Sequence, residues 1–149
     1  MKIEDEIKQY KYYSEFHKAF INIIYTANWL NSKTNALLKP FGITPQQYNV
    51  LRILRGQYPN PVTLGAIQER MLDKMSNASR LVDKLIEKKL VERAICEHNR
   101  RQVDIKINEK GMSLLKDIEE PLKTTFEKLN NLSTEEAVMI NDLLDKIRE

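Results

Sequence analysis

Residues 63–111 read TLGAIQERMLDKMSNASRLVDKLIEKKLVERAICEHNRRQVDIKINEKG, and the spacing of the apolar side chains changes within this stretch. At first they recur every three or four positions, which predicts two helices over 64–71 and 75–89 joined by a tight connection. Further on they alternate, which predicts strands over 91–95 and 103–107 with a polar hairpin tip between them. Two short helices followed by a β-hairpin form a winged helix-turn-helix, so this stretch predicts a DNA-binding lobe.

The second helix of the pair is predicted to read DNA. Outward side chains at the start of such a helix reach base edges, where Arg pairs with guanine and Asn with adenine. Lysines beside them neutralise phosphates, and arginines at the hairpin tip suit a narrow minor groove. The helical wheel places Met75 on the inward side. The candidate DNA-binding residues are Ser76, Asn77, Ser79 and Arg80 for bases, Lys74, Lys84, Lys88 and Lys89 for phosphates, and Arg100 and Arg101 for the minor groove.

Helices are also predicted before this lobe. Residues 1–13 are charged and rich in Tyr, which indicates a loose lead-in or a frayed first turn. A long helix over 14–39 carries apolar residues at alternating spacings of four and three, and Pro40 ends it. The next helix begins at Thr44, where the sequence Thr-Pro-Gln-Gln favours a capping box.

Two further helices are predicted after the hairpin. Asn108 is placed to cap the first of them, and Pro121 is expected to kink or break it. Ser133 and Glu136 have the spacing of a second capping box, which opens the last helix.

The apolar stripes of the terminal helices are too long to be buried by a small winged helix alone. They can pack together within one chain, or they can form a two-fold interface with a second copy, which is the commonest oligomer. The predicted fold class is mainly α with a small β-hairpin wing. We expect an N-terminal dimerisation helix over 1–40, a DNA-binding lobe over 41–110 and C-terminal dimerisation helices over 111–149.

The charge distribution agrees with a DNA-binding middle. Residues 74–110 hold 10 basic and 6 acidic side chains, net +4, whereas residues 111–149 hold 5 and 9, net −4. A basic segment followed by an acidic one indicates a polyanion partner, here double-stranded DNA. No run approaches the roughly 18 apolar residues of a membrane span, and the N-terminus has no apolar signal region, so a cytoplasmic protein without membrane contact is expected.

The sequence offers no support for catalysis. It contains no Ser/His/Asp arrangement and no Gly-rich phosphate loop, so neither an enzyme nor a cofactor is expected. With two histidines and one cysteine, a metal site of three or four ligands is also not expected. The single cysteine, Cys96, fits a reducing compartment.

The chain resembles the MarR family of bacterial transcription regulators, and the resemblance covers most of its length in order. Residues 44–48 (TPQQY) are similar to the start of the family's second helix. Residues 81–85 (LVDKL) and 89–93 (KLVER) resemble the recognition helix and the entry to the wing. Residues 99–101 (NRR) and 108–111 (NEKG) resemble the wing and the next helix. The sequence departs from the family pattern in having Asn99 where Asp is usual and Leu90 where Gly is usual.

The resemblance implies a homodimer formed by N- and C-terminal helices. It further implies binding to palindromic DNA and repression that a small anionic or phenolic effector relieves. By position, base reading falls on Ser76, Asn77, Ser79 and Arg80, and the minor-groove arginine is Arg101, with Arg100 beside it.

Two other functions remain open at this point. One is a winged-helix dimer that contacts another protein, and the other is a redox-responsive regulator that uses Cys96. An effector pocket can also form from aromatic side chains near the junction of the lobe and the long helices. The candidates for such a pocket are Phe20, Tyr25, Trp29, Phe41 and Tyr48.

Overall fold

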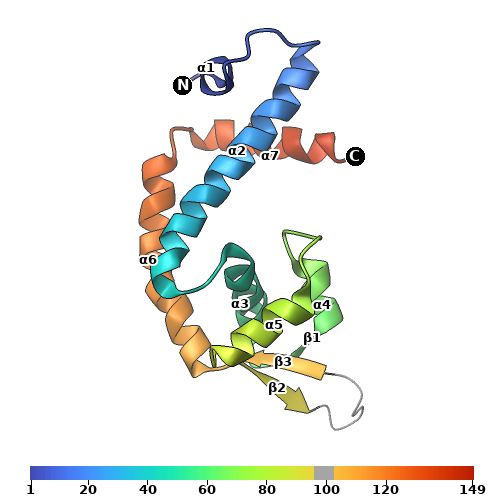
Figure 1. The fold of residues 1–149 in the computed structure, drawn as a ribbon, viewed down its shortest axis with the longest axis vertical. Coiled ribbons are helices and arrows are strands. Elements are labelled where there is room, and N and C mark those ends of the chain that lie inside the picture. The colour runs from blue at the N-terminus through green and yellow to red at the C-terminus, as the bar shows by residue number, and fades with distance from the viewer. Residues whose placement is uncertain (96–102) are drawn as a thin grey trace.

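The computed structural model describes residues 1–95 and 103–149, and it consists of a small lobe from which two long helices rise (Figure 1). This mostly helical structure with one small sheet confirms the predicted fold class. The elements in chain order are α1 (Ile3–Ile7), α2 (Glu15–Leu38), the 3-10 helix η1 (Lys39–Phe41), α3 (Pro45–Gln57), β1 (Val62–Thr63), α4 (Leu64–Arg70), α5 (Ala78–Glu87), β2 (Val91–Ile95), β3 (Val103–Ile107), α6 (Glu109–Leu129) and α7 (Thr134–Ile147).

The lobe contains a three-stranded antiparallel sheet in the order β1-β3-β2. The predicted hairpin forms, and its ladder runs from Val91 opposite Ile107 to Ile95 opposite Val103. The sequence pattern does not reveal β1, because a strand of two residues is too short to show alternation. Its Val62 pairs with Ile105, so β1 covers the other edge of β3 and brings α4 onto the sheet.

An apolar core holds α3, α4, α5 and the first half of α6 against the sheet. The fully buried side chains recur at helical or alternating spacing, so each element presents one apolar face to this core. Burying each of them stabilises the lobe by about 1.5–3 kcal/mol. They include Leu51 and Leu54 from α3, Ile67 from α4, Val82 and Leu85 from α5, Ile105 and Ile107 from β3, and Leu115 and Ile118 from α6.

The helix starts follow the capping signals in the sequence. Both capping boxes form: the side chains of Thr44 and Ser133 accept from backbone N–H groups, and those of Gln47 and Glu136 accept in return. Thr63 caps α4 in the same manner, by accepting from the N–H of Ala66. These bonds satisfy N–H groups that the first turn of a helix leaves without a partner.

The predicted start of the recognition helix is wrong. The helix begins at Ala78 instead of residue 75, because the Asn77 side chain accepts a hydrogen bond from the N–H of Arg80 at 3.0 Å and caps it there. Met75 therefore lies outside the helix. It is 93% exposed and does not face inward as the helical wheel predicts. The connection between α4 and α5 is correspondingly longer than predicted.

Helix α6 is not broken at Pro121, which was one of the two outcomes expected there. Pro121 lacks the N–H that would bond one turn back, but its ring is exposed, so the helix continues on both sides of it. The hydroxyl of Thr125 donates to the Pro121 carbonyl at 2.8 Å and gives that group a second partner in the next turn.

Residues 1–13 are not simply a loose lead-in, because they contain the short helix α1 folded back on α2 (Figure 1). Ile3 is buried at this contact. Lys18 donates to Glu4 at 2.5 Å, which lowers the pKa of the carboxyl and raises the pKa of the ammonium. The Tyr25 hydroxyl donates to Glu6 at 2.5 Å, and this bond raises the pKa of the phenol.

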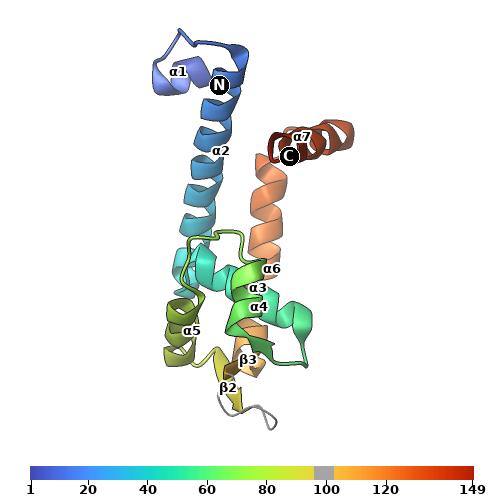
Figure 2. The same cartoon turned by 90° about the vertical axis from the view of Figure 1, so that its right-hand side faces the viewer.

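Much of the two long helices and α7 stands clear of the lobe, as Figure 2 shows. Their outer parts expose large apolar side chains, whereas the lobe buries most of its own. No helix within residues 1–95 and 103–149 has the length and apolarity of a bilayer span. The exposed apolar side chains of this region, called here the terminal apolar face, are Phe16, Phe20, Ile24, Trp29 and Leu30 on α2, Phe126 on α6, and Val138, Met139, Ile140, Leu143 and Ile147 on α7.

A tight junction joins the end of α5, the start of β2 and the start of α6. Asn108 caps α6 by accepting from the N–H of Gly111, and its amide donates to the Lys89 carbonyl at 3.1 Å. Lys89 has a positive φ of 58°, which turns the chain out of α5 as a Schellman-type ending does. A Cβ at Gly111 would lie 2.3 Å from the Leu90 carbonyl oxygen, so only glycine fits this approach.

The Gly111→Ala substitution should lower the free energy of unfolding by about 1–3 kcal/mol, because the added methyl group overlaps the backbone of Leu90. Gly65→Ala is the matched control, since a Cβ on this exposed residue of α4 meets only the Thr63 hydroxyl at 3.9 Å. The control should keep or raise stability, by up to about 1 kcal/mol. Urea unfolding of both variants measures the difference. A Gly111→Ala protein as stable as wild type would show that the junction does not require the close approach.

Candidate nucleic-acid interface

Three side chains hold the connection between α4 and α5 in one shape. Asn49 on α3 accepts from the N–H of Leu72 at 2.9 Å. Gln68 on α4 donates to the Lys74 carbonyl at 3.1 Å and accepts from the N–H of Ala78 at 3.1 Å. The position of the first residue of α5 is therefore set by a side chain of α4. Sequence reasoning missed Asn49 and Gln68, because an amide side chain gives no signal of its distant partner.

Asp73 is the third side chain that holds the connection, and it bonds the residues just before α5. Its carboxylate accepts from the Met75 N–H at 3.0 Å and from the Ser76 hydroxyl at 2.7 Å. The Ser76 hydroxyl therefore already has an acceptor within the turn. The Asn77 side-chain oxygen is likewise occupied by the helix cap, so Asn77 cannot form the two-bond pairing with adenine while it caps.

Two of the predicted base-reading side chains are left free at the helix start. Ser79 and Arg80 lie in the first turn of α5 and are both exposed. Within the part of the chain that the structure describes, the Arg80 guanidinium has no acceptor. An unpaired guanidinium at the N-terminal end of such a helix can fork onto a guanine edge.

The predicted phosphate-binding lysines are mostly engaged with the protein. Lys84 pairs with Glu87 at 2.9 Å, in an exposed pair that water screens. Lys74 donates to the Glu69 carbonyl, and Lys88 donates to the Gly42 carbonyl. Lys74 and Lys88 each keep two further N–H groups, and Lys84, which bonds both oxygens of Glu87, keeps one, so each can still meet a phosphate.

An ion pair connects the recognition helix to the hairpin. Arg93 on β2 donates to Asp83 on α5 at 2.8 Å. Asp83 faces outward, and its negative charge would repel DNA phosphates. The ion pair with Arg93 neutralises that charge. Cys96, Arg100 and Arg101 lie outside the described residues, beyond the last pair of the ladder at Ile95 and Val103.

The start of α5, the α4–α5 connection and the open end of the hairpin lie on one side of the lobe, on the right in Figure 1 and toward the viewer in Figure 2. A helix and a wing on one side can engage adjacent grooves of one duplex.

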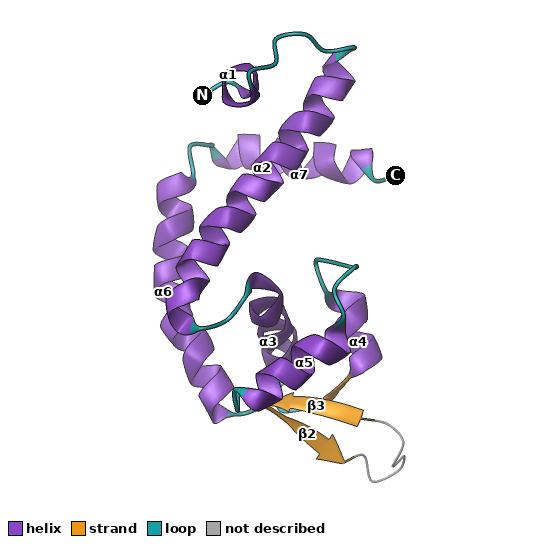
Figure 3. Ribbon diagram, viewed as in Figure 1, coloured by secondary structure: helices purple, strands orange, loops and turns teal. Residues whose placement is uncertain are grey.

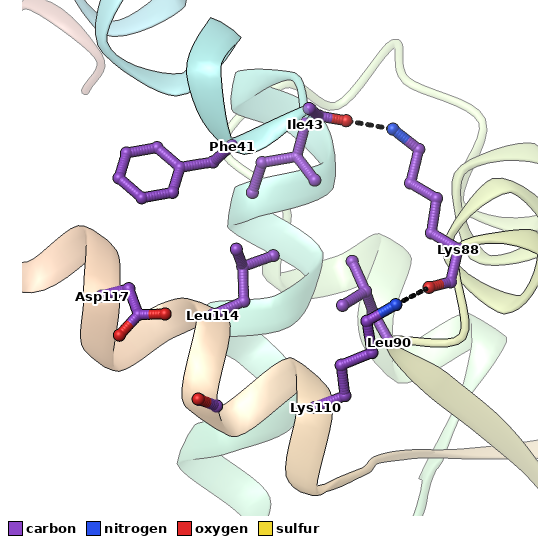
Figure 4. Close-up of a pocket in the computed structure, with 9 residues that line it drawn as sticks. Phe41, Ile43, Lys88, Leu90, Lys110, Leu114 and Asp117 are labelled. Carbon is purple, nitrogen blue, oxygen red and sulfur yellow. Dashed lines mark hydrogen bonds between the residues drawn. The ribbon is translucent and has the colours of Figure 1, made fainter.

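A pocket of about 510 Å³ lies where the lobe meets the long helices (Figure 4). Phe41, Ile43, Leu90 and Leu114 line its apolar part. Lys88, Lys110 and Asp117 supply charged groups around it, and Lys110 donates to the Lys88 carbonyl at 3.1 Å.

The aromatic side chains suggested as pocket residues do not come together. Phe41 lines the pocket at the junction, but Tyr25 and Trp29 line a separate hollow of about 340 Å³ beside α1. Phe20 is exposed, and Tyr48 packs against the core of the lobe. Across residues 1–95 and 103–149, no cluster of three His, Cys, Asp or Glu side chains is placed to hold a metal ion.

Comparison with known proteins gives relatives of one kind. A sequence model described as the MarR family matches residues 41–102. The HTH-type transcriptional regulator MhqR of Bacillus subtilis (strain 168) is 29% identical over 131 residues, which cover 87% of this chain and 89% of MhqR. A MarR transcription factor from Planctomyces limnophilus superposes with a TM-score of 0.69 at 29% identity, covering 91% of this chain and 98% of that one. A putative MarR-like regulator from Bacillus cereus ATCC 10987 is 18% identical, with a TM-score of 0.79 and coverage of 90% and 96%, and shares the fold.

The fold and the site define a winged helix-turn-helix DNA-binding protein. Its likeness is to the MarR family, whose model matches residues 41–102 and whose members are DNA-binding transcription regulators.

The Arg80→Ala substitution should weaken binding to a specific duplex by about fivefold to 150-fold, because one two-bond base contact contributes about 1–3 kcal/mol of discrimination. Binding to random duplex should change little. Fluorescence anisotropy with both duplexes measures the two constants. Arg148→Ala removes the same charge at the far end of α7 and should change neither. Equal losses on specific and random DNA for Arg80→Ala would mean that Arg80 contacts phosphate and not bases.

Proposed function

We propose that this chain is a MarR-family repressor in the bacterial cytoplasm that binds a palindromic operator as a homodimer. In this proposal Arg80 and Ser79 read bases directly, and Ser76 and Asn77 shape the helix start and approach the same groove. Lys74 and Lys84 contact phosphates. Arg100 and Arg101 enter the minor groove. The observation that carries the proposal is the free Arg80 guanidinium at the start of a helix whose position three side chains fix.

The terminal apolar face supports the homodimer. Apolar side chains are exposed along α2 and α7, and a face of this extent on a small protein is typical of an interface. We assign dimerisation to residues 1–40 and 111–149 and DNA binding to 41–110. A two-fold dimer presents two recognition helices about 34–36 Å apart on successive turns of a duplex, which requires a palindromic site.

The pocket at the junction supports control by a small aromatic or anionic effector. Its apolar lining suits a ring, and Lys88 and Lys110 suit an anionic group. A ligand there touches the end of α5, the start of α6 and the α2–α3 connection together. It can release DNA only if it binds better when the recognition helices have a spacing that the operator does not match.

The proposal is tested by selecting duplexes from a random library with the purified protein at about 150 mM salt, where phosphate contacts alone are weakened. Enrichment of a palindrome supports a sequence-specific dimer. Salt-sensitive binding without enrichment contradicts base reading. An absence of binding favours the alternative of a winged-helix dimer that contacts another protein.

The effector part is tested by measuring the distance between spin labels on the two recognition helices, with and without a panel of benzoates and phenols. A compound that releases DNA should change this distance. Release of the operator with an unchanged distance would contradict the proposed mechanism.

The Ile140→Glu substitution should convert the protein to monomers, because it places a charge on the terminal apolar face. Affinity for the selected palindrome should then fall by at least about tenfold, since one lobe binds one half-site. Asn141→Glu adds the same charge about 100° round α7 and is the matched control. Sedimentation and DNA titration measure both effects. A dimeric Ile140→Glu protein with full affinity would show that this part of α7 lies outside the interface.

A further inference from the structure

An exposed methionine stands directly before the recognition helix. Met75 lies three residues before Ala78, the first residue of α5, and 93% of it is exposed. Methionine is apolar, and the other methionine beside this connection, Met71, is only 1% exposed. An apolar side chain in this place gains little from contacts with the protein itself, so it is available to contact a partner.

The backbone around Met75 is held on both sides. Its own N–H donates to the Asp73 carboxylate at 3.0 Å, and the next residue, Ser76, donates both its N–H and its hydroxyl to Asp73. The preceding carbonyl, that of Lys74, accepts from Gln68 on α4. Met75 therefore projects from a fixed turn and not from a loose loop. Figure 3 shows this connection at the opposite end of α4 from the sheet.

The same turn leaves few polar groups for reading bases. Ser76 and Asn77 use their side-chain acceptors or donors within the turn and the cap. Among the described residues at the start of α5, the side chains of Ser79, Arg80 and Met75 are exposed and make no side-chain hydrogen bond. Two of these are polar, and the third can make only an apolar contact.

We propose that Met75 is a specificity-determining residue that packs on the C5-methyl group of a thymine in the major groove. Thymine is the one base that presents an apolar group there, and apolar side chains distinguish it by contact with that methyl. The long, flexible Met side chain can reach a groove floor from a turn that is held at the groove edge. Arg80 reads a guanine by hydrogen bonds, and Met75 adds an apolar reading of a neighbouring position in the same half-site.

Leu72 provides a matched comparison within the same connection. It is also apolar and 88% exposed, but its N–H is bonded to Asn49 on α3, at the end of the connection next to α4. It lies further from the start of α5 along the chain. Its side chain is therefore not expected to reach the groove that α5 enters.

This inference rests on the proposed function, because it requires a specific operator. The experiment uses the full-length protein and the duplex that selection enriches. Each thymine of the half-site is replaced in turn by deoxyuridine, which removes the methyl group and leaves every hydrogen-bonding group unchanged. Affinities are measured for wild type, Met75→Ala and Leu72→Ala.

Wild type and Leu72→Ala should lose about threefold to fivefold in affinity at one thymine, the effect of one buried methyl group. Met75→Ala should bind the thymine duplex more weakly by a similar factor and should not respond to deoxyuridine at that position. Circular dichroism checks that Met75→Ala keeps its fold.

Three results would overturn the inference. If wild type responds to no deoxyuridine, Met75 reads no methyl group, whereas the proposed function stands. If Met75→Ala and wild type respond equally at every thymine, the methyl is read by another residue. If selection enriches no duplex, the proposed function and this inference fail together.

Discussion

The close approach of α6 to the end of α5 is the constraint on which the rest of the structure depends. Because Gly111 has no Cβ, the start of α6 can approach the Leu90 carbonyl closely. Asn108 accepts from the N–H of Gly111 and donates to the Lys89 carbonyl. The recognition helix, the first strand of the wing and the long C-terminal helix therefore meet at one rigid point. A shift of α6 must move α5, and this connection joins the terminal helices to the DNA-binding lobe mechanically.

A second, smaller set of hydrogen bonds decides which polar side chains at the start of α5 remain available to contact bases. Asn49, Gln68 and Asp73 come from different parts of the lobe and together fix the connection that precedes the helix. Asp73 occupies the Ser76 hydroxyl, the helix cap occupies the Asn77 side-chain oxygen, and Arg80 has no side-chain acceptor among the described residues. The chemistry available for base reading therefore depends on which polar side chains the turn uses for itself. An Asn or Ser at the start of a recognition helix is a base-reading candidate only if the helix does not need it as a cap.

The uneven distribution of apolar surface separates the two parts of the chain. The lobe closes its own core around α3, α5, β3 and the first half of α6. The distal parts of α2, α6 and α7 do not, and exposed Phe16, Ile24 and Ile140 illustrate the difference. The pocket lined by Phe41 and Leu114 lies between these parts, beside the junction at Leu90. A ligand in that position would contact both the part proposed to read DNA and the part proposed to set the spacing of two copies.

The local sequence determined most of the element order. Hydrophobic period and capping residues predict α2 to α4, the hairpin, α6 and α7, because these signals act within one or two turns of the chain. An outward position near the start of the predicted helix makes Arg80 a base-reading candidate, and within residues 1–95 and 103–149 its guanidinium has no acceptor. The short strand β1 and the docked helix α1 were decided by partners far along the chain, at Ile105, Lys18 and Tyr25. Asn77 caps α5, and the shape of the connection before it, which leaves Met75 exposed, depended on bonds from Gln68 and Asp73 that no spacing rule contains. Sequence therefore determined where helices and strands form, whereas only the tertiary structure decided which side chains those elements leave free, since that depends on contacts between residues remote in the chain.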